Sequence, residues 1–198
     1  MSADATPAPP QRPRADALRN RAKLLAAARD AFAAGDGDVT FDTLARRAGV
    51  GIGTLYRNFP NRQALVEAVY RSELDDVVAS ATTLLETHPA DVALRRWVDR
   101  YAAFVATKHG MAEAFRQALT SGAIAASDTR ERVRGTVGRF LTAGAADGTL
   151  RADVEADDVT VALLGAMLGT TSTAADPGQR GRVLDLLVAG LRADPTAR

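Results

Sequence analysis

The sequence predicts an all-α protein of about nine helices, in which an N-terminal three-helix domain containing a helix-turn-helix precedes a C-terminal helical bundle. Apolar residues recur at the three- and four-residue spacing of one helix face along most of the chain, and no stretch of useful length alternates as a strand would. The 198 residues, 46% hydrophobic and 25% charged, suit a globular protein. The expected divisions are a disordered arm over 1–15, the three-helix domain over 16–61 and the bundle over 62–198.

The first helix is expected from Asp16 to Ala34. Its apolar stripe consists of Leu18, Ala22, Leu25, Ala28 and Phe32. The segment 35–38, with alternating Gly and Asp, ends this helix. The arm before it is rich in alanine and proline and carries Arg12 and Arg14, a composition that predicts disorder in the free protein.

Two short helical patterns then meet at Gly49 with no room for a loop between them. Thr40 is a suitable N-cap for the first pattern, and Gly49 can close it in the left-handed conformation. Its buried face is expected to contain Phe41, Leu44, Ala45 and Ala48. The second pattern runs from Ile52 to Phe59, with Ile52, Leu55 and Phe59 turned inward, and Pro60 stops it. This is the outline of a helix-turn-helix.

The opposite face of the second helix carries groups that can reach base edges and phosphates in a major groove, namely hydroxyls, a guanidinium and an amide. Glycines at its start let the backbone approach the phosphates, and an arginine opens the next helix. We therefore expect the DNA contacts to come from Thr40, Gly51, Gly53, Thr54, Tyr56, Arg57, Asn58 and Arg62. Taken alone, Tyr56 is better explained as a half-buried packing residue, but the whole block at helix-turn-helix spacing favours a DNA contact. A phosphate-binding glycine loop is not indicated, because a helix precedes the glycines and the third glycine is missing.

The segment LARRAGVGIGTLYRNFPNRQAL resembles the DNA-binding signature of the TetR family of transcriptional regulators. The matching positions are Thr40, Leu44, Ala45, Ala48, Gly49, Val50, Thr54, Leu55, Tyr56, Asn58, Phe59, Asn61, Arg62 and Leu65. Two positions depart from the family pattern: Gly51 stands where serine is commoner, and Arg62 where lysine is.

The charge distribution agrees with a DNA-binding N-terminal domain. Residues 1–62 hold ten basic and six acidic residues, 10 − 6 = +4, whereas the remainder holds 15 and 18, 15 − 18 = −3. A basic surplus beside the helix-turn-helix attracts a phosphate backbone, although a solvated arm explains part of it. The arm itself is either a plain flexible tail or a segment whose arginines reach into the minor groove.

Residues 62–87 are expected to form one long helix, joined to the recognition helix through only Pro60 and Asn61. Such a rod can carry a displacement to the DNA-reading helices, or it is simply a packing helix. Further helices are expected at about 89–108, 111–121, 127–147 and 156–174, and after Pro177.

The stretch LRRWVDRYAAFVATKHGMAEAF also resembles the C-terminal domain of SbtR-like members of this family. The resemblance implies a homodimer with a small-molecule pocket in each C-terminal domain, whose occupation changes the spacing of the recognition helices. Large apolar side chains can line such a pocket, although any single one of them is better explained as ordinary core. The candidates for effector binding are Trp97, Tyr101, Phe104, Met111, Phe115, Phe140 and Met167, with Thr107, His109 and Gln117 as polar neighbours.

The last two helices are the expected dimer interface, because they offer more apolar surface than one packed stripe needs and two glycines four residues apart. The candidates for this interface are Leu164, Gly165, Leu168, Gly169, Leu184, Leu187 and Leu191. The alternative is a helix pair buried within one chain.

No enzyme is indicated, because the chain lacks cysteine and its two histidines, His88 and His109, have no metal-ligand or nucleophile partners at a useful spacing. No cofactor, secretion signal or membrane span is indicated either, which favours the cytoplasm. We therefore interpret the sequence as that of a ligand-responsive, homodimeric repressor that binds a palindromic double-stranded DNA operator. The alternative is a helical ligand-binding or scaffold protein whose DNA binding is vestigial.

Overall fold

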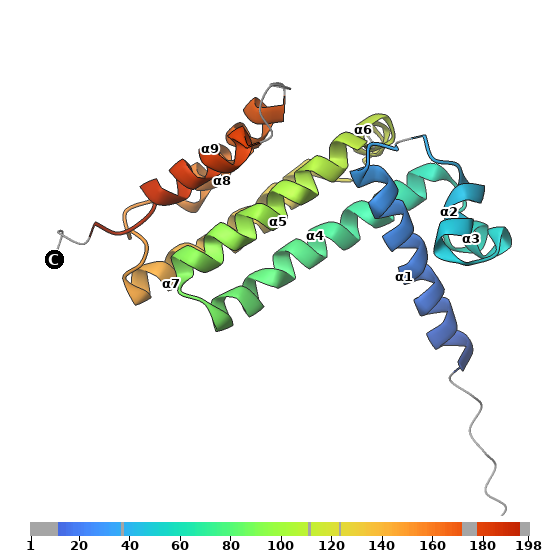
Figure 1. The fold of residues 1–198 in the computed structure, drawn as a ribbon, viewed down its shortest axis with the longest axis horizontal. Helices are drawn as coiled ribbons and strands as arrows, with labels where there is room; N and C mark the ends of the chain where they lie inside the picture. Colours follow the sequence, from blue (N-terminus) through green and yellow to red (C-terminus); the bar gives the residue numbers. More distant parts are fainter. Residues whose placement is uncertain (1–11, 37, 111, 123, 172–177, 195–198) are drawn as a thin grey trace, which may run out of the picture.

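The computed structural model describes residues 12–36, 38–110, 112–122, 124–171 and 178–194. Within these ranges the chain forms nine α-helices and no β-strand (Figure 1). The helices are α1 (Arg12–Ala33), α2 (Phe41–Ala48), α3 (Ile52–Asn58), α4 (Arg62–Thr87), α5 (Ala90–Gly110), α6 (Ala112–Thr120), α7 (Ala126–Asp147), α8 (Ala156–Thr171) and α9 (Gln179–Gly190). The all-α prediction is confirmed.

The helix-turn-helix lies at one end of the molecule, where α2 and α3 pack beside α1 and the start of α4 (Figure 1). The Thr40 hydroxyl caps α2 by accepting a hydrogen bond from the Thr43 amide at 3.2 Å. Gly49 adopts the left-handed conformation, with φ of 65°, and its amide donates to the Arg46 carbonyl at 3.1 Å. Both features follow the sequence: a hydroxyl residue caps, and a residue without a Cβ makes the sharp turn.

Helix α4 belongs to both halves of the molecule. Asn61 caps it through the Ala64 amide at 2.8 Å, immediately after α3 and Pro60. Its first turns, through Val69, bury apolar side chains in the core shared with α1, α2 and α3, whereas from Tyr70 onward it belongs to the larger core. At 1.5 Å per residue its 26 residues extend about 39 Å. The division between the two cores thus falls inside a continuous helix.

The larger core is formed by α4 to α9, with α5 at its centre. The Trp97 side chain is fully buried, and its indole N–H donates to the Val77 carbonyl of α4 at 3.0 Å. The end of α9 is tied to the turn after α7, because the Arg151 amide donates to the Leu191 carbonyl at 2.9 Å. These contacts make α4–α9 one packed unit around the middle of the chain.

Three details of the predicted helices are wrong. Helix α1 begins at Arg12, not Asp16, and Leu18 on it is 68% exposed. The N-terminal turns of α1 extend beyond α4 in Figure 1, so its buried stripe starts only at Leu24. Ile52 is 41% exposed, because it opens α3 while Leu55 and Phe59 fill the core below.

Candidate DNA-binding surface and ligand cavity

The outer face of α3 carries Tyr56 and Arg57 in the open. Tyr56 is 54% exposed, and its ring lies 5.3 Å from that of Phe41 on α2. The Arg57 guanidinium lies along the helix, with Nε donating to the Gly53 carbonyl at 3.1 Å and Nη2 to the Thr54 hydroxyl at 3.2 Å. These bonds hold the arginine in an ordered position while leaving its charge at the surface. Such an arrangement suits a bidentate contact to a guanine edge.

Asn58 is half-buried, and its amide group donates to the Thr54 carbonyl at 2.8 Å. This bond supports the last turn of α3, so the amide is partly occupied by the protein. Thr40 is exposed, but its hydroxyl is likewise occupied in capping α2. Both residues therefore have a structural role beside any contact with DNA.

Gly51 and Gly53 are not required by the interior of the domain. A Cβ added at either position would meet no atom within 4 Å, and Gly51 has an ordinary φ of −68°. The glycines instead leave the start of α3 without side chains on a surface that faces outward. This agrees with close backbone approach to an external partner.

Arg62 lies where the sequence predicted it, at the start of α4, but its guanidinium faces into the domain. Nη1 donates to the Val39 carbonyl at 2.8 Å, the guanidinium carbon lies 5.8 Å from the centre of the Phe32 ring, and Nη2 is buried without a partner. Because Nη1 is engaged by a backbone carbonyl and Nη2 is buried, Arg62 has a structural role that joins α4 to the segment before α2. The phosphate contact of Arg62 stays a prediction.

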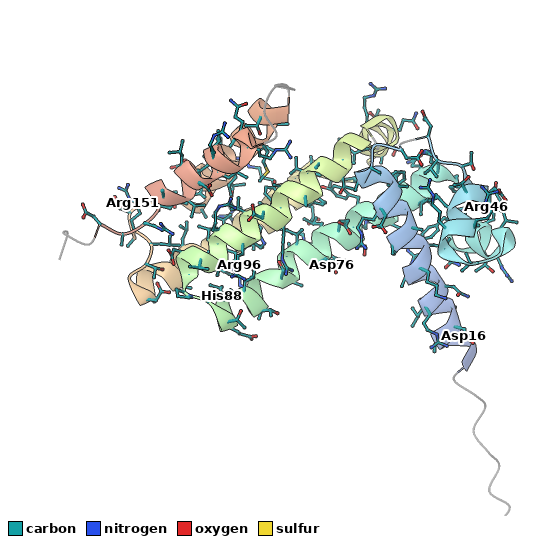
Figure 2. The ribbon with its side chains drawn as sticks, viewed as in Figure 1. Asp16, Arg46, Asp76, His88, Arg96 and Arg151 are labelled. Carbon is teal, nitrogen blue, oxygen red and sulfur yellow. The ribbon has the colours of Figure 1, made fainter. Side chains whose placement is uncertain are left out.

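Two arginines that the sequence interpretation missed lie on α2. Arg46 and Arg47 are exposed, and Figure 2 shows Arg46 at the outer edge of the helix-turn-helix. Arg46 is held by Asp42 at 3.1 Å and by the Thr43 hydroxyl at 3.2 Å. Their position on the polar side of the α2 pattern was a usable signal, since adjacent basic residues there add positive charge to the DNA-facing end.

A cavity of about 560 Å³ opens between α4, α5, α6, α7 and α8. Its wall is largely apolar and aromatic, with a few polar groups. It is lined by Tyr70, Tyr101, Lys108, Phe115, Leu119, Ala126, Thr129, Arg130, Thr160, Val161, Leu164, Gly165 and Leu168. This size and lining fit a site for a small organic molecule. Tyr101 and Phe115 are therefore brought to the cavity as predicted.

Four other predicted pocket residues do not line it. The side chains of Trp97, Phe104, Phe140 and Met167 are at most 2% exposed and belong to the larger core. They pack inside the bundle, as in the Trp97–Phe140 ring contact at 5.6 Å, so the core alternative is correct for them. The side chains of Met111 and His109 lie outside the described residues.

Burial shifts the pKa values of three titratable groups in the cavity wall. Desolvation lowers the pKa of Lys108 to about 8 and raises the pKa of Tyr101 to about 12. Desolvation also raises the pKa of Tyr70, whose hydroxyl shares a hydrogen bond of 2.5 Å with that of Thr129. At neutral pH the wall therefore carries a lysine ammonium beside two neutral phenols.

The predicted dimerisation residues divide into two groups. Leu164 and Leu168 are exposed on α8, where Gly165 and Gly169 also face open space. Leu184 and Leu191 are buried and Leu187 packs against the same core, so these three α9 leucines stabilise the chain itself. The interpretation missed Val161 and Leu186, which are 52% and 73% exposed, because excess apolar content does not reveal which residues face outward.

Within the described ranges, no group of three histidine, aspartate or glutamate side chains is arranged to hold a metal ion. None of the helices in those ranges is long and apolar enough to cross a membrane.

Comparisons with known proteins agree with this geometry. The family profile for bacterial regulatory proteins of the tetR family matches residues 24–69, and that for the SbtR-like transcriptional regulator C-terminal domain matches residues 89–193. A search of curated protein sequences gave no match.

Among solved structures, a TetR transcriptional regulator from Streptomyces coelicolor is 41% identical, over 89% of this chain and 99% of that chain, with a TM-score of 0.77. A TetR transcription regulatory protein from Mycobacterium vanbaalenii is 34% identical, over 91% and 99% of the two chains, with a TM-score of 0.71. A gamma-butyrolactone receptor shares the fold at 21% identity and a TM-score of 0.55, over 92% of each chain. The helix-turn-helix, the cavity-bearing bundle and these matches together show that the chain belongs to the TetR family of transcriptional regulators and has an SbtR-like C-terminal domain.

Proposed function

We propose that this regulator binds a palindromic operator as a homodimer and is released from it when a small molecule occupies the cavity, so that it acts as a repressor. The observation that carries this proposal is the position of Phe115 on α6. Its ring lines the cavity, lies 5.1 Å from the Tyr70 ring on α4, and packs against both hydrophobic cores. A ligand that displaces Phe115 therefore pushes directly on the DNA-reading half.

In this proposal Thr54 and Arg57 contact base edges in the DNA. Tyr56 contacts the phosphate backbone of the DNA, and Gly51 and Gly53 allow α3 to approach that backbone closely. Arg46 and Arg47 on α2 add positive charge next to α3. Phosphate contacts set orientation and general affinity, whereas base-edge contacts give specificity. Thr40 and Asn58 are assigned supporting roles, because their side chains already stabilise α2 and α3.

The route from cavity to DNA runs through two contacts on α4. Near its middle, Tyr70 bonds to Thr129 on α7, and both residues line the cavity. At its first turn, Gln63 donates from its amide to the Ser121 hydroxyl at 2.9 Å, just after α6. Because only Phe59, Pro60 and Asn61 separate α3 from α4, a shift of α6 or α7 relative to α4 changes the position of α3.

The dimer is proposed to form through exposed apolar residues of α8 and α9, namely Val161, Leu164, Leu168 and Leu186. The three α8 residues also line the cavity, so the proposed interface borders the ligand site and the two share these side chains. Solvent-exposed leucines and valines clustered on two neighbouring helices are typical of an interaction surface. A two-fold axis there would present two copies of α3 to successive half-sites. Since one recognition helix contacts few bases, two copies also supply the specificity that one lacks.

Selection of bound duplexes from a random pool tests the proposal. The wild-type protein is expected to enrich a two-fold symmetric motif, whereas the Arg57→Ala variant should enrich a weaker or altered one. Enrichment of an asymmetric single half-site would contradict the dimeric arrangement.

The alternative function is a ligand-binding scaffold with vestigial DNA binding. Measuring duplex DNA affinity at a series of salt concentrations distinguishes it from the regulator. DNA affinity that falls steeply with salt supports phosphate contacts, whereas no retention of duplex DNA even at low salt favours the scaffold.

A further inference from the structure

The cavity contains one of the only two lysines in the chain, Lys108, against 23 arginines. Its Nζ lies 4.4 Å from the centre of the Phe104 ring, 5.1 Å from that of Tyr70 and 5.5 Å from that of Phe115. These three rings surround the ammonium and stabilise its charge through their faces. Among the described residues no carboxylate pairs with Lys108.

The other cation at the cavity is different. Arg130 lines it too, but its Nη2 is held by both oxygens of Asp157, at 2.9 and 3.0 Å. The charge of Arg130 is thus largely balanced, whereas Lys108 has three aromatic neighbours and, within the described part of the chain, no carboxylate partner. An unbalanced ammonium in an apolar cavity attracts an anion, because the surrounding low dielectric strengthens their attraction.

The other residues of the cavity wall indicate the chemistry of the rest of the ligand. Val161, Leu164 and Leu168 of α8 and Leu119 of α6 provide aliphatic surface, and Tyr101 provides an aromatic face. We propose that the cavity binds an amphipathic anion, with a carboxylate-type head on the Lys108 ammonium and an apolar body against α8. This inference names the ligand class of the proposed effector site and rests on the proposed function only for the effect on DNA.

The test uses the purified full chain with three probes. Octanoate carries charge and body, octanamide the same body without charge, and acetate the charge without the body. Binding is followed by calorimetry and by fluorescence of the single tryptophan, Trp97, whose ring stacks on that of Tyr101 at 5.4 Å. Octanoate is expected to bind roughly tenfold or more tightly than octanamide, as a charged hydrogen-bonding pair requires, and acetate more weakly than either.

Lys108→Met keeps a long unbranched side chain, one atom shorter than lysine, and removes its charge, so the preference for octanoate should disappear. Lys23→Met is the matched control, because Lys23 is the other lysine and is exposed on α1. The preference should persist in this variant. Equal binding of octanoate and octanamide by the wild type, binding of neither, or a preference that survives Lys108→Met would overturn the inference.

A second measurement needs no variant. Among the residues that the structure describes, the titratable groups lining the cavity are Lys108, Tyr70, Tyr101 and Arg130. Burial lowers the pKa of Lys108 to about 8, whereas it raises the pKa of Tyr101 to about 12 and raises that of Tyr70. Octanoate affinity should fall as pH rises from 7 to 9.5, whereas octanamide affinity stays constant; a flat octanoate profile would count against the lysine. If octanoate shows the lysine-dependent preference but leaves operator binding unchanged, the anion site stands and the effector role fails.

Discussion

The outer face of α3 and the wall of the cavity are built in opposite ways. The proposed DNA-binding face uses neighbours within one seven-residue helix, presents polar groups outward and leaves its glycines open to solvent. The cavity collects residues from Tyr70 to Leu168 on five helices, turns apolar groups inward and contains an ammonium. Side chains on the outer face of α3 can therefore be substituted without disturbing the core. In the bundle, by contrast, neighbouring positions on one helix lie either on the cavity wall or in the core.

The largest expected effect is a loss of stability that distinguishes a core residue from a residue of the cavity wall. Trp97→Ala should lower the free energy of unfolding by about 3–5 kcal/mol, because a fully buried indole is removed and its bond to Val77 is lost. Chemical denaturation measures the change. Tyr101→Phe is the control at the wall and should cost far less, since its ring is kept. A small loss for Trp97→Ala would mean that this residue belongs to the cavity after all.

The next effect tests the local surface. Arg57→Ala should weaken operator binding by roughly 10- to 100-fold, equivalent to about 1–3 kcal/mol for a bidentate base contact, with little change in stability. Fluorescence anisotropy with the selected operator and with random duplex gives the two affinities. If both fall by the same factor, Arg57 contacts the backbone and does not read a base.

A third effect concerns the buried charge. The pKa of Lys108 is about 8 in the folded chain and 10.5 without its environment, so above pH 8 the unfolded state binds more protons than the folded state. The free energy of unfolding should therefore rise between pH 8 and 10, by about 2 kcal/mol relative to the Lys108→Met variant. Below about pH 7, where Lys108 is protonated in both states, the two proteins should differ by a constant amount. An unchanging difference across pH 8–10 would show that Lys108 is not desolvated.

The smallest expected effect is a substitution that raises stability while it lowers DNA affinity. Gly53→Ala should stabilise the helix-turn-helix by about 0.5–1 kcal/mol, since alanine is the better helix former and its Cβ meets no atom within 4 Å. DNA affinity should nevertheless fall, because the new methyl group lies where the phosphates approach. Thermal unfolding and anisotropy on the same preparation test both signs. Unchanged DNA affinity would remove Gly53 from the interface.

The contrast also explains what the sequence could predict. The helix-turn-helix was predictable because its cap, its turn and its exposed face follow one another within twenty residues, as Thr40, Gly49 and Arg57 do. The structural bond of Arg62 was not predictable, because the Val39 carbonyl that it binds comes from a different segment of the chain. A side chain's direction depends on that tertiary neighbour.

In the bundle, the periodicity of the sequence identified the apolar side chains. It did not distinguish those in the core from those that line the cavity. Trp97 and Tyr101 are one turn apart with stacked rings, yet only Tyr101 reaches the cavity. Lys108 gave no signal at all, because a single charge at the end of an amphipathic helix is ordinarily solvated. Its three aromatic neighbours come from α4, α5 and α6, which only the fold brings together.

We propose that the cavity and α3 form one coupled system, joined through Phe115 and α4. The direct test is octanoate affinity of the full-length protein with and without a saturating amount of the selected operator. Coupling predicts that operator DNA weakens octanoate binding by the same factor by which octanoate weakens operator binding. Equal octanoate affinity with and without operator would contradict the claim.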